Sequence, residues 1–122
     1  MNNIISTEEL KKLIDKKDKF ILIDVRNKEE LHNGIIPTAK NIPLPELEDA
    51  FNLNEKEFKN KYNFNKPSGK DNMIAYCRTG GRSHIATDIL IKKGFKARNY
   101  EGSIWEWSTI DPNVKRYGPS PY

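Results

Sequence analysis

The sequence predicts an α/β domain with a mostly parallel sheet. Two apolar runs, residues 20–25 and 72–77, have the length and composition of strands that are buried on both faces. Helical patterns alternate with the strand-like runs, and this alternation is typical of parallel α/β folds. The length of 122 residues fits one domain around a single hydrophobic core.

Start and stop signals divide the first half of the chain into elements. Ser6 and Glu9 have the spacing of a capping box, which predicts the start of a helix. Gly34 is expected to stop a helical turn, and Pro43 and Pro45 separate the elements on either side of them. The expected elements are an edge strand at 3–5, a helix to about 17, the strand at 20–25, a helical turn at 28–33, a strand at 39–42 and one helical stretch at 46–62.

The second half repeats the alternation. Gly94 is a natural C-terminal stop for the longest helix of this half. The apolar residues expected to face inward from that helix are Ile85, Ala86, Ile89 and Leu90. The expected elements are a loop at 63–71, the strand at 72–77, a helix at 83–93, a strand at 97–100, a short helix at 103–109 and an irregular tail at the surface.

Composition narrows the function classes. The chain is 36% hydrophobic and 31% charged, and it has no apolar run long enough to span a membrane. The N-terminus has no pattern of a signal peptide, so we expect a cytosolic protein, with a mitochondrial location kept open. A net charge of +4 comes from scattered lysines rather than a basic stripe, which argues against nucleic-acid binding. The single cysteine and two isolated histidines give no metal-ligand spacing.

The loop that follows the second buried run combines a thiol with features that stabilise anions. It reads Cys77, Arg78, Thr79, Gly80, Gly81, Arg82 and Ser83. The two glycines allow a tight curl with N–H groups turned inward, and the next helix adds its positive end. The two arginines add permanent charge. All these features favour the thiolate, which is the nucleophilic form of cysteine. His84, just after the loop, is interpreted as a surface residue rather than a base.

This loop resembles the active-site loop of the rhodanese-like domain family. Two further segments resemble family motifs: residues 23–43, which include Asp24, Arg26 and Glu30, and residues 102–107. The similarity extends from about residue 5 to 107, and it is greatest to small single-domain thiosulfate sulfurtransferases of the eukaryotic type. Ile35 and Thr38 depart from the family, which usually has histidine and often glycine there, so the local turn is expected to differ.

The resemblance implies a three-layer rhodanese fold with about five mostly parallel strands flanked by helices. Residues 1–122 would form a single domain, with a core at about 4–109 and a C-terminal tail at 110–122. Cys77 would carry sulfur as a persulfide, and the six residues after it would bind the substrate. Asp24, Arg26 and Glu30 would be structural supports, with Glu30 a candidate partner for Arg26. No cofactor is implied.

The implied partners are a small anionic sulfur donor, such as thiosulfate, and a thiol acceptor such as glutathione, or cyanide. We expect a monomer and leave open a protein donor or acceptor, in which case the chain is a sulfur carrier or a regulatory module. A phosphatase or arsenate reductase on the same fold is a further alternative. Four residues separate Cys77 from Arg82, one fewer than in the related cell-cycle phosphatases, and the smaller ring favours sulfur over phosphate.

Overall fold

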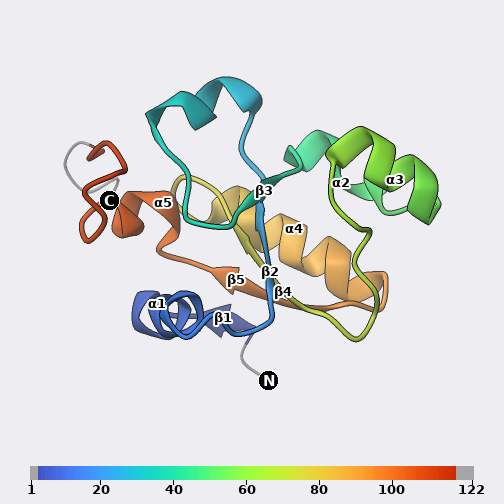
Figure 1. Ribbon diagram of the computed structural model, residues 1–122, viewed down its shortest axis with the longest axis horizontal. Helices are drawn as coiled ribbons and strands as arrows, with labels where there is room; N and C mark the ends of the chain where they lie inside the picture. The colour runs from blue at the N-terminus through green and yellow to red at the C-terminus, as the bar shows by residue number, and fades with distance from the viewer. Residues whose placement is uncertain (1–2, 118–122) are drawn as a thin grey trace.

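The computed structural model describes residues 3–117 and shows one five-stranded sheet between two layers of helices (Figure 1). The strands lie in the order β1-β5-β4-β2-β3, and every neighbouring pair is parallel. The strands are β1 (Ile4–Ile5), β2 (Ile21–Asp24), β3 (Lys40–Asn41), β4 (Asn72–Tyr76) and β5 (Lys96–Tyr100). The predicted α/β class with mostly parallel strands is therefore confirmed.

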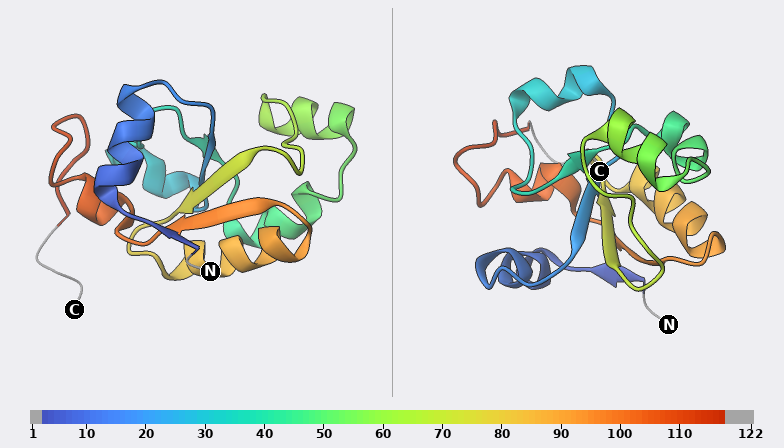
Figure 2. Two further views of the ribbon diagram at one scale, coloured as in Figure 1. Left: turned by 90° about the horizontal axis from the view of Figure 1, so that it is seen from below. Right: turned by 45° about the vertical axis from the view of Figure 1, so that its right-hand side comes forward.

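Side chains alternate between the two faces of the sheet and build a hydrophobic cluster on each side. The helices are α1 (Thr7–Asp15), the 3₁₀ helix η1 (Lys28–Asn33), α2 (Leu44–Ala50), α3 (Glu55–Tyr62), α4 (Gly81–Lys92) and α5 (Ser103–Trp107). Ile23, Met73 and Ala75 pack with α2, α3 and α4, whereas Leu22 and Ile74 pack with α1 and α5. Figure 2 shows the sheet between these two helical layers.

Local signals in the sequence explain most of the element ends. The capping box of Ser6 and Glu9 is formed at the start of α1. Gly34 ends η1 with a φ of 117°, and Gly94 follows α4 with a φ of 91°, so both occupy the region that favours glycine. These three predictions are confirmed.

Four sequence-based expectations need correction. The single helix expected over residues 46–62 is two helices, because Asn54 caps a new helix and pairs with Glu57 in a second capping box. Helix α4 begins at Gly81 rather than Ser83, and Ile85 is 51% exposed instead of facing inward. The tail does not lie wholly at the surface: Val114 is only 3% exposed and belongs to the core, while residues 118–122 fall outside the described part.

The parallel strands place their carboxyl ends at one edge of the sheet. Cys77 directly follows β4, Arg26 lies just beyond β2, and Ser103 lies just beyond β5. Open α/β sheets bind ligands at this edge, outside the carboxyl ends of the strands. The topology therefore brings together three motifs that lie far apart in the sequence.

Candidate active site

The Cys77 loop curls back so that its main chain points at the sulfur. The Gly80 N–H donates to Cys77 Sγ over 3.1 Å. Gly80 has a φ of 98°, and a Cβ at this position would overlap the main-chain carbonyl oxygen of Glu101. Both the conformation and the lack of space require glycine here. Gly81, by contrast, starts α4 and has open space around the position of its missing Cβ.

The surroundings of Cys77 favour its thiolate. The residue is only 1% exposed, and this burial by itself would raise the pKa of the thiol. Hydrogen bonds oppose that effect: the Ser83 hydroxyl lies 3.5 Å from Sγ, and N–H groups of Ser83, Gly80 and Thr79 also point toward the sulfur. Their sum outweighs burial and lowers the pKa of Cys77 below its ordinary value.

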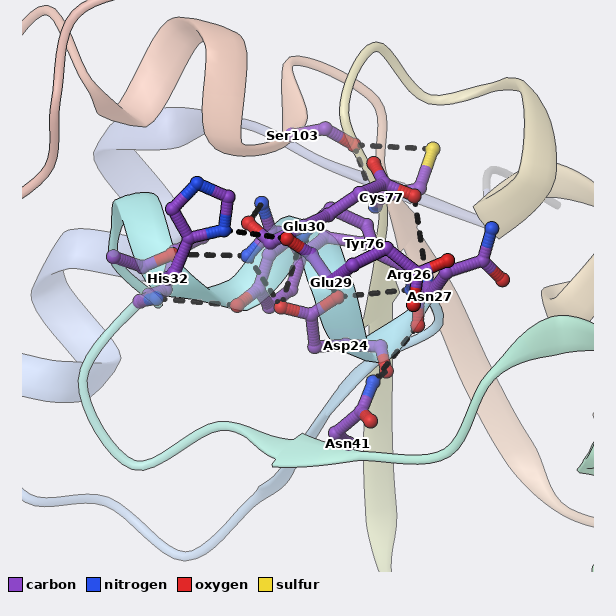
Figure 3. A network of polar contacts seen from close by, with 12 residues as sticks. Asp24, Arg26, Asn27, Glu29, Glu30, His32, Asn41, Tyr76, Cys77 and Ser103 are labelled. Carbon is purple, nitrogen blue, oxygen red and sulfur yellow. Dashed lines mark hydrogen bonds and ion pairs between the residues drawn. The ribbon is translucent and has the colours of Figure 1, made fainter.

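Ser103 also supports this cysteine, and Figure 3 shows the two residues side by side. Its hydroxyl accepts a hydrogen bond from the Cys77 N–H over 3.1 Å and donates to the Tyr100 carbonyl over 2.8 Å. The same oxygen lies 4.0 Å from Cys77 Sγ. Ser103 was expected only to begin a helix. Its position in the third family-like segment was the one signal for a role near the loop.

Arg82 is held by the carboxylate of Glu30, the residue named above as a candidate partner for Arg26. The guanidinium donates to both carboxylate oxygens, over 2.6 and 2.9 Å. The hydrogen bond from Arg82 lowers the pKa of Glu30 and raises the pKa of Arg82. Arg26 contacts only the main-chain oxygen of Glu30, over 3.2 Å. The ion pair therefore ties the end of the Cys77 loop to η1.

Asp24 and Arg26 form a fully buried ion pair at the end of β2. Three hydrogen bonds of 2.8 to 3.1 Å join the guanidinium to the carboxylate. Burial alone would lower the pKa of Arg26, but the Asp24 carboxylate outweighs it and raises the pKa. The remaining N–H groups of Arg26 donate to the Gly34 carbonyl and to the Tyr117 hydroxyl, each over 3.0 Å. One side chain thus joins β2, η1 and the C-terminal segment.

Arg78 lies outside the buried ion pair and meets this network only at Tyr117. Its side chain is exposed, and its guanidinium lies over the Tyr117 ring, 5.1 Å from the centroid. It also lines a cavity of about 350 Å³ between η1 and residues 115–117. His84 is exposed and faces Asp88 at 3.7 Å, away from the thiol contacts described above. The two loop arginines therefore have different surroundings.

Over residues 3–117, no cluster of three or more metal-ligating side chains was found. Within the same range, no helix is long and apolar enough to cross a membrane. The chemistry available at the site is that of a stabilised thiolate with the Arg82 guanidinium near it.

Known proteins resemble this chain in sequence and in fold. The family model described as a rhodanese-like domain matches residues 6–110. A putative mitochondrial thiosulfate sulfurtransferase of Schizosaccharomyces pombe is 47% identical over 89 residues, which are 72% of this chain and 63% of that protein. A human thiosulfate:glutathione sulfurtransferase is 37% identical over 105 residues, covering 84% of this chain and 90% of that protein.

A solved structure shows the same fold. The human single-domain sulfurtransferase TSTD1 superposes with a TM-score of 0.86 at 34% identity, covering 91% of this chain and 99% of that one. The chain belongs to the rhodanese-like domain family. Within that family it is a sulfurtransferase, because its named relatives and its structural neighbour are sulfurtransferases.

Proposed function

We propose that Cys77 carries a sulfane sulfur from thiosulfate to a small thiol. The Cys77 thiolate attacks the outer sulfur of thiosulfate and forms a new S–S bond. The S–S bond within thiosulfate breaks, and sulfite leaves with the electron pair. The enzyme now holds a Cys77 persulfide, and no external oxidant or reductant is needed. This step requires the thiolate, and the Gly80 N–H and the Ser83 hydroxyl directed at Cys77 Sγ are the observation that carries the proposal.

The second step returns the enzyme to its starting form. The thiolate of an acceptor such as glutathione attacks the outer sulfur of the persulfide. The acceptor leaves as a persulfide, and the electron pair of the broken bond remains on Cys77 as a thiolate. Cyanide would accept the same sulfur and leave as thiocyanate. The two half-reactions share one covalent intermediate, so the kinetics should be ping-pong.

The loop residues have separate roles in this scheme. The N–H groups of Thr79, Gly80 and Ser83 stabilise the anionic sulfur of both the thiolate and the persulfide. Arg78, exposed at the mouth of the loop, binds the sulfonate of the donor. Arg82 adds positive charge near the sulfur while Glu30 holds it in place.

Initial-rate kinetics test this function. Varying thiosulfate and glutathione together should give parallel double-reciprocal lines, and Cys77→Ser should have no activity. Intersecting lines would contradict a covalent persulfide intermediate. An aryl phosphate in the same assay tests the phosphatase alternative, and we expect no hydrolysis because only four residues separate Cys77 from Arg82.

A sulfur carrier fed by a protein is the second candidate, because the exposed Arg78 also suits a protein surface. A purified cysteine desulfurase supplied as donor would separate the two. Much faster loading from the desulfurase than from thiosulfate would favour the carrier. We further propose that the protein works in the cytosol as a monomer. Subcellular fractionation and size-exclusion chromatography test these two points.

A further inference from the structure

The lining of the cavity beside Arg78 is connected to both ends of the Cys77 loop. Arg78, which directly follows Cys77, forms part of its lining. Glu30, also in the lining, holds Arg82 at the far end of the loop. The volume of about 350 Å³ is within the range of small-molecule sites. Thiosulfate is too small to fill this space, and in a ping-pong cycle its sulfite leaves before the acceptor reacts, so the space is available to a larger second reactant.

The outer wall of the cavity, formed by residues 115–117, is fixed to the fold. The Lys115 N–H donates to the Asn33 carbonyl over 3.0 Å, and Val114 next to it is buried. Val114 packs directly against Gly34, where a Cβ would lie only 3.1 Å from the Val114 Cα. The Tyr117 hydroxyl accepts the 3.0 Å bond from the buried Arg26. Hydrogen bonds and packing therefore hold this wall of the cavity in place.

The charges that line the cavity suit a zwitterion with excess negative charge. Arg78, Lys115 and Arg116 are exposed cations in the lining, and none of them forms an ion pair with the described part of the chain. Glu29 adds a carboxylate that has no ion-pair partner among residues 3–117, whereas Glu30 is occupied by Arg82. Glutathione carries two carboxylates and one ammonium group at neutral pH, which complements this pattern.

We propose that this cavity is the subsite for the acceptor, and that it selects small thiols with free carboxylates. The inference rests on the proposed sulfur transfer through Cys77. The acceptor thiol reaches the persulfide beside Arg78, and Lys115 and Arg116 bind its carboxylates. Glu29 faces its ammonium group. Lys115 and Arg116 are thus specificity-determining residues for the second half-reaction, with no part in loading of the enzyme.

The experiment isolates that half-reaction. The enzyme is loaded with thiosulfate, freed of small molecules and mixed with an acceptor, while intact mass follows the loss of sulfur from the protein. The acceptors are glutathione and uncharged 2-mercaptoethanol. The test variant is Lys115→Ala/Arg116→Ala. The control, Lys56→Ala/Lys59→Ala, removes the same charge from α3, which Figure 1 places at the opposite end of the molecule from the C-terminal segment.

We expect the test variant to load sulfur at the wild-type rate. Its second-order rate constant with glutathione should fall roughly five- to thirtyfold, as two exposed charge contacts are lost. With 2-mercaptoethanol the constant should change less than about twofold, since that acceptor makes no such contacts. The control variant should match the wild type with both acceptors.

The subsite assignment would be overturned if the rate constant of the test variant fell equally with both acceptors, or did not fall with glutathione. If the rate constant of the control variant with glutathione fell as much as that of the test variant, the net charge of the protein rather than the cavity would be responsible. The subsite assignment would then also fail. A failure of the wild-type enzyme to load sulfur would instead refute the proposed function, so the two failures are distinguishable.

Discussion

Replacing Ser83 with alanine should weaken the Cys77 thiolate. The Ser83 side chain is fully buried, and its Oγ lies 3.5 Å from Sγ. A hydrogen bond to a charged group contributes about 1.5–3 kcal/mol, and we take the lower value because the contact is long. Since 1.4 kcal/mol is a factor of ten, the thiolate fraction at a given pH below the pKa should fall about tenfold.

Alkylation by iodoacetamide measures this directly, because its rate follows the thiolate fraction. The rate is recorded from about pH 5 to 10 for wild type and Ser83→Ala. Thr87→Val is the matched control: it removes another buried hydroxyl of α4, one that donates to the Ser83 carbonyl over 2.8 Å. An unchanged pH profile for Ser83→Ala, or an equal change in the control, would refute the reasoning.

Three further outcomes follow from the site. Gly80→Ala should lose most thiolate reactivity and Gly81→Ala should keep it, because only the Cβ at Gly80 would overlap Glu101; alkylation of both variants is the check. Arg82→Ala should reduce sulfur transfer more than Glu30→Gln, which keeps the Arg82 charge, and the double variant should lose no more than Arg82→Ala alone; additive losses in steady-state rates would show that the two residues act separately. The hydrogen bond from Arg82 lowers the pKa of Glu30, so their contact stabilises the fold above the unfolded-state pKa of about 4.3 and is lost as the pH falls through the lower folded-state pKa. The free energies of unfolding of wild type and Glu30→Gln, measured as a function of pH, should therefore become equal at the acid end.

Local signals were sufficient to predict most of the fold. The capping box of Ser6 and Glu9, the stop at Gly34 and the two buried central strands depend on neighbours in sequence, and all are present. The break between α2 and α3 also had a local signal, since Asn54 and Glu57 repeat the capping-box spacing. The sequence predicts one helix there because Leu47, Phe51, Phe58 and Tyr62 keep the spacing of a single apolar helix face across the break.

The pairings at the site depend on contacts that no local pattern encodes. Glu30 and Arg82 meet across 52 residues because β2 and β4 are neighbours in the sheet, whereas the family resemblance had suggested Arg26 as a candidate partner of Glu30. Ser103 reaches Cys77 only because β5 lies beside β4. The burial of Val114 against Gly34 likewise follows from the final packing. The roles assigned to the loop residues remain predictions that the proposed experiments test.

Intact-mass spectrometry after incubation with thiosulfate tests the central claim most directly. The protein has one cysteine, so a single persulfide should form. We expect a gain of roughly 32 Da, the mass of one sulfur atom, that a reducing thiol removes, and no gain in Cys77→Ser. An unmodified wild-type protein, or the same gain in the serine variant, would contradict the account.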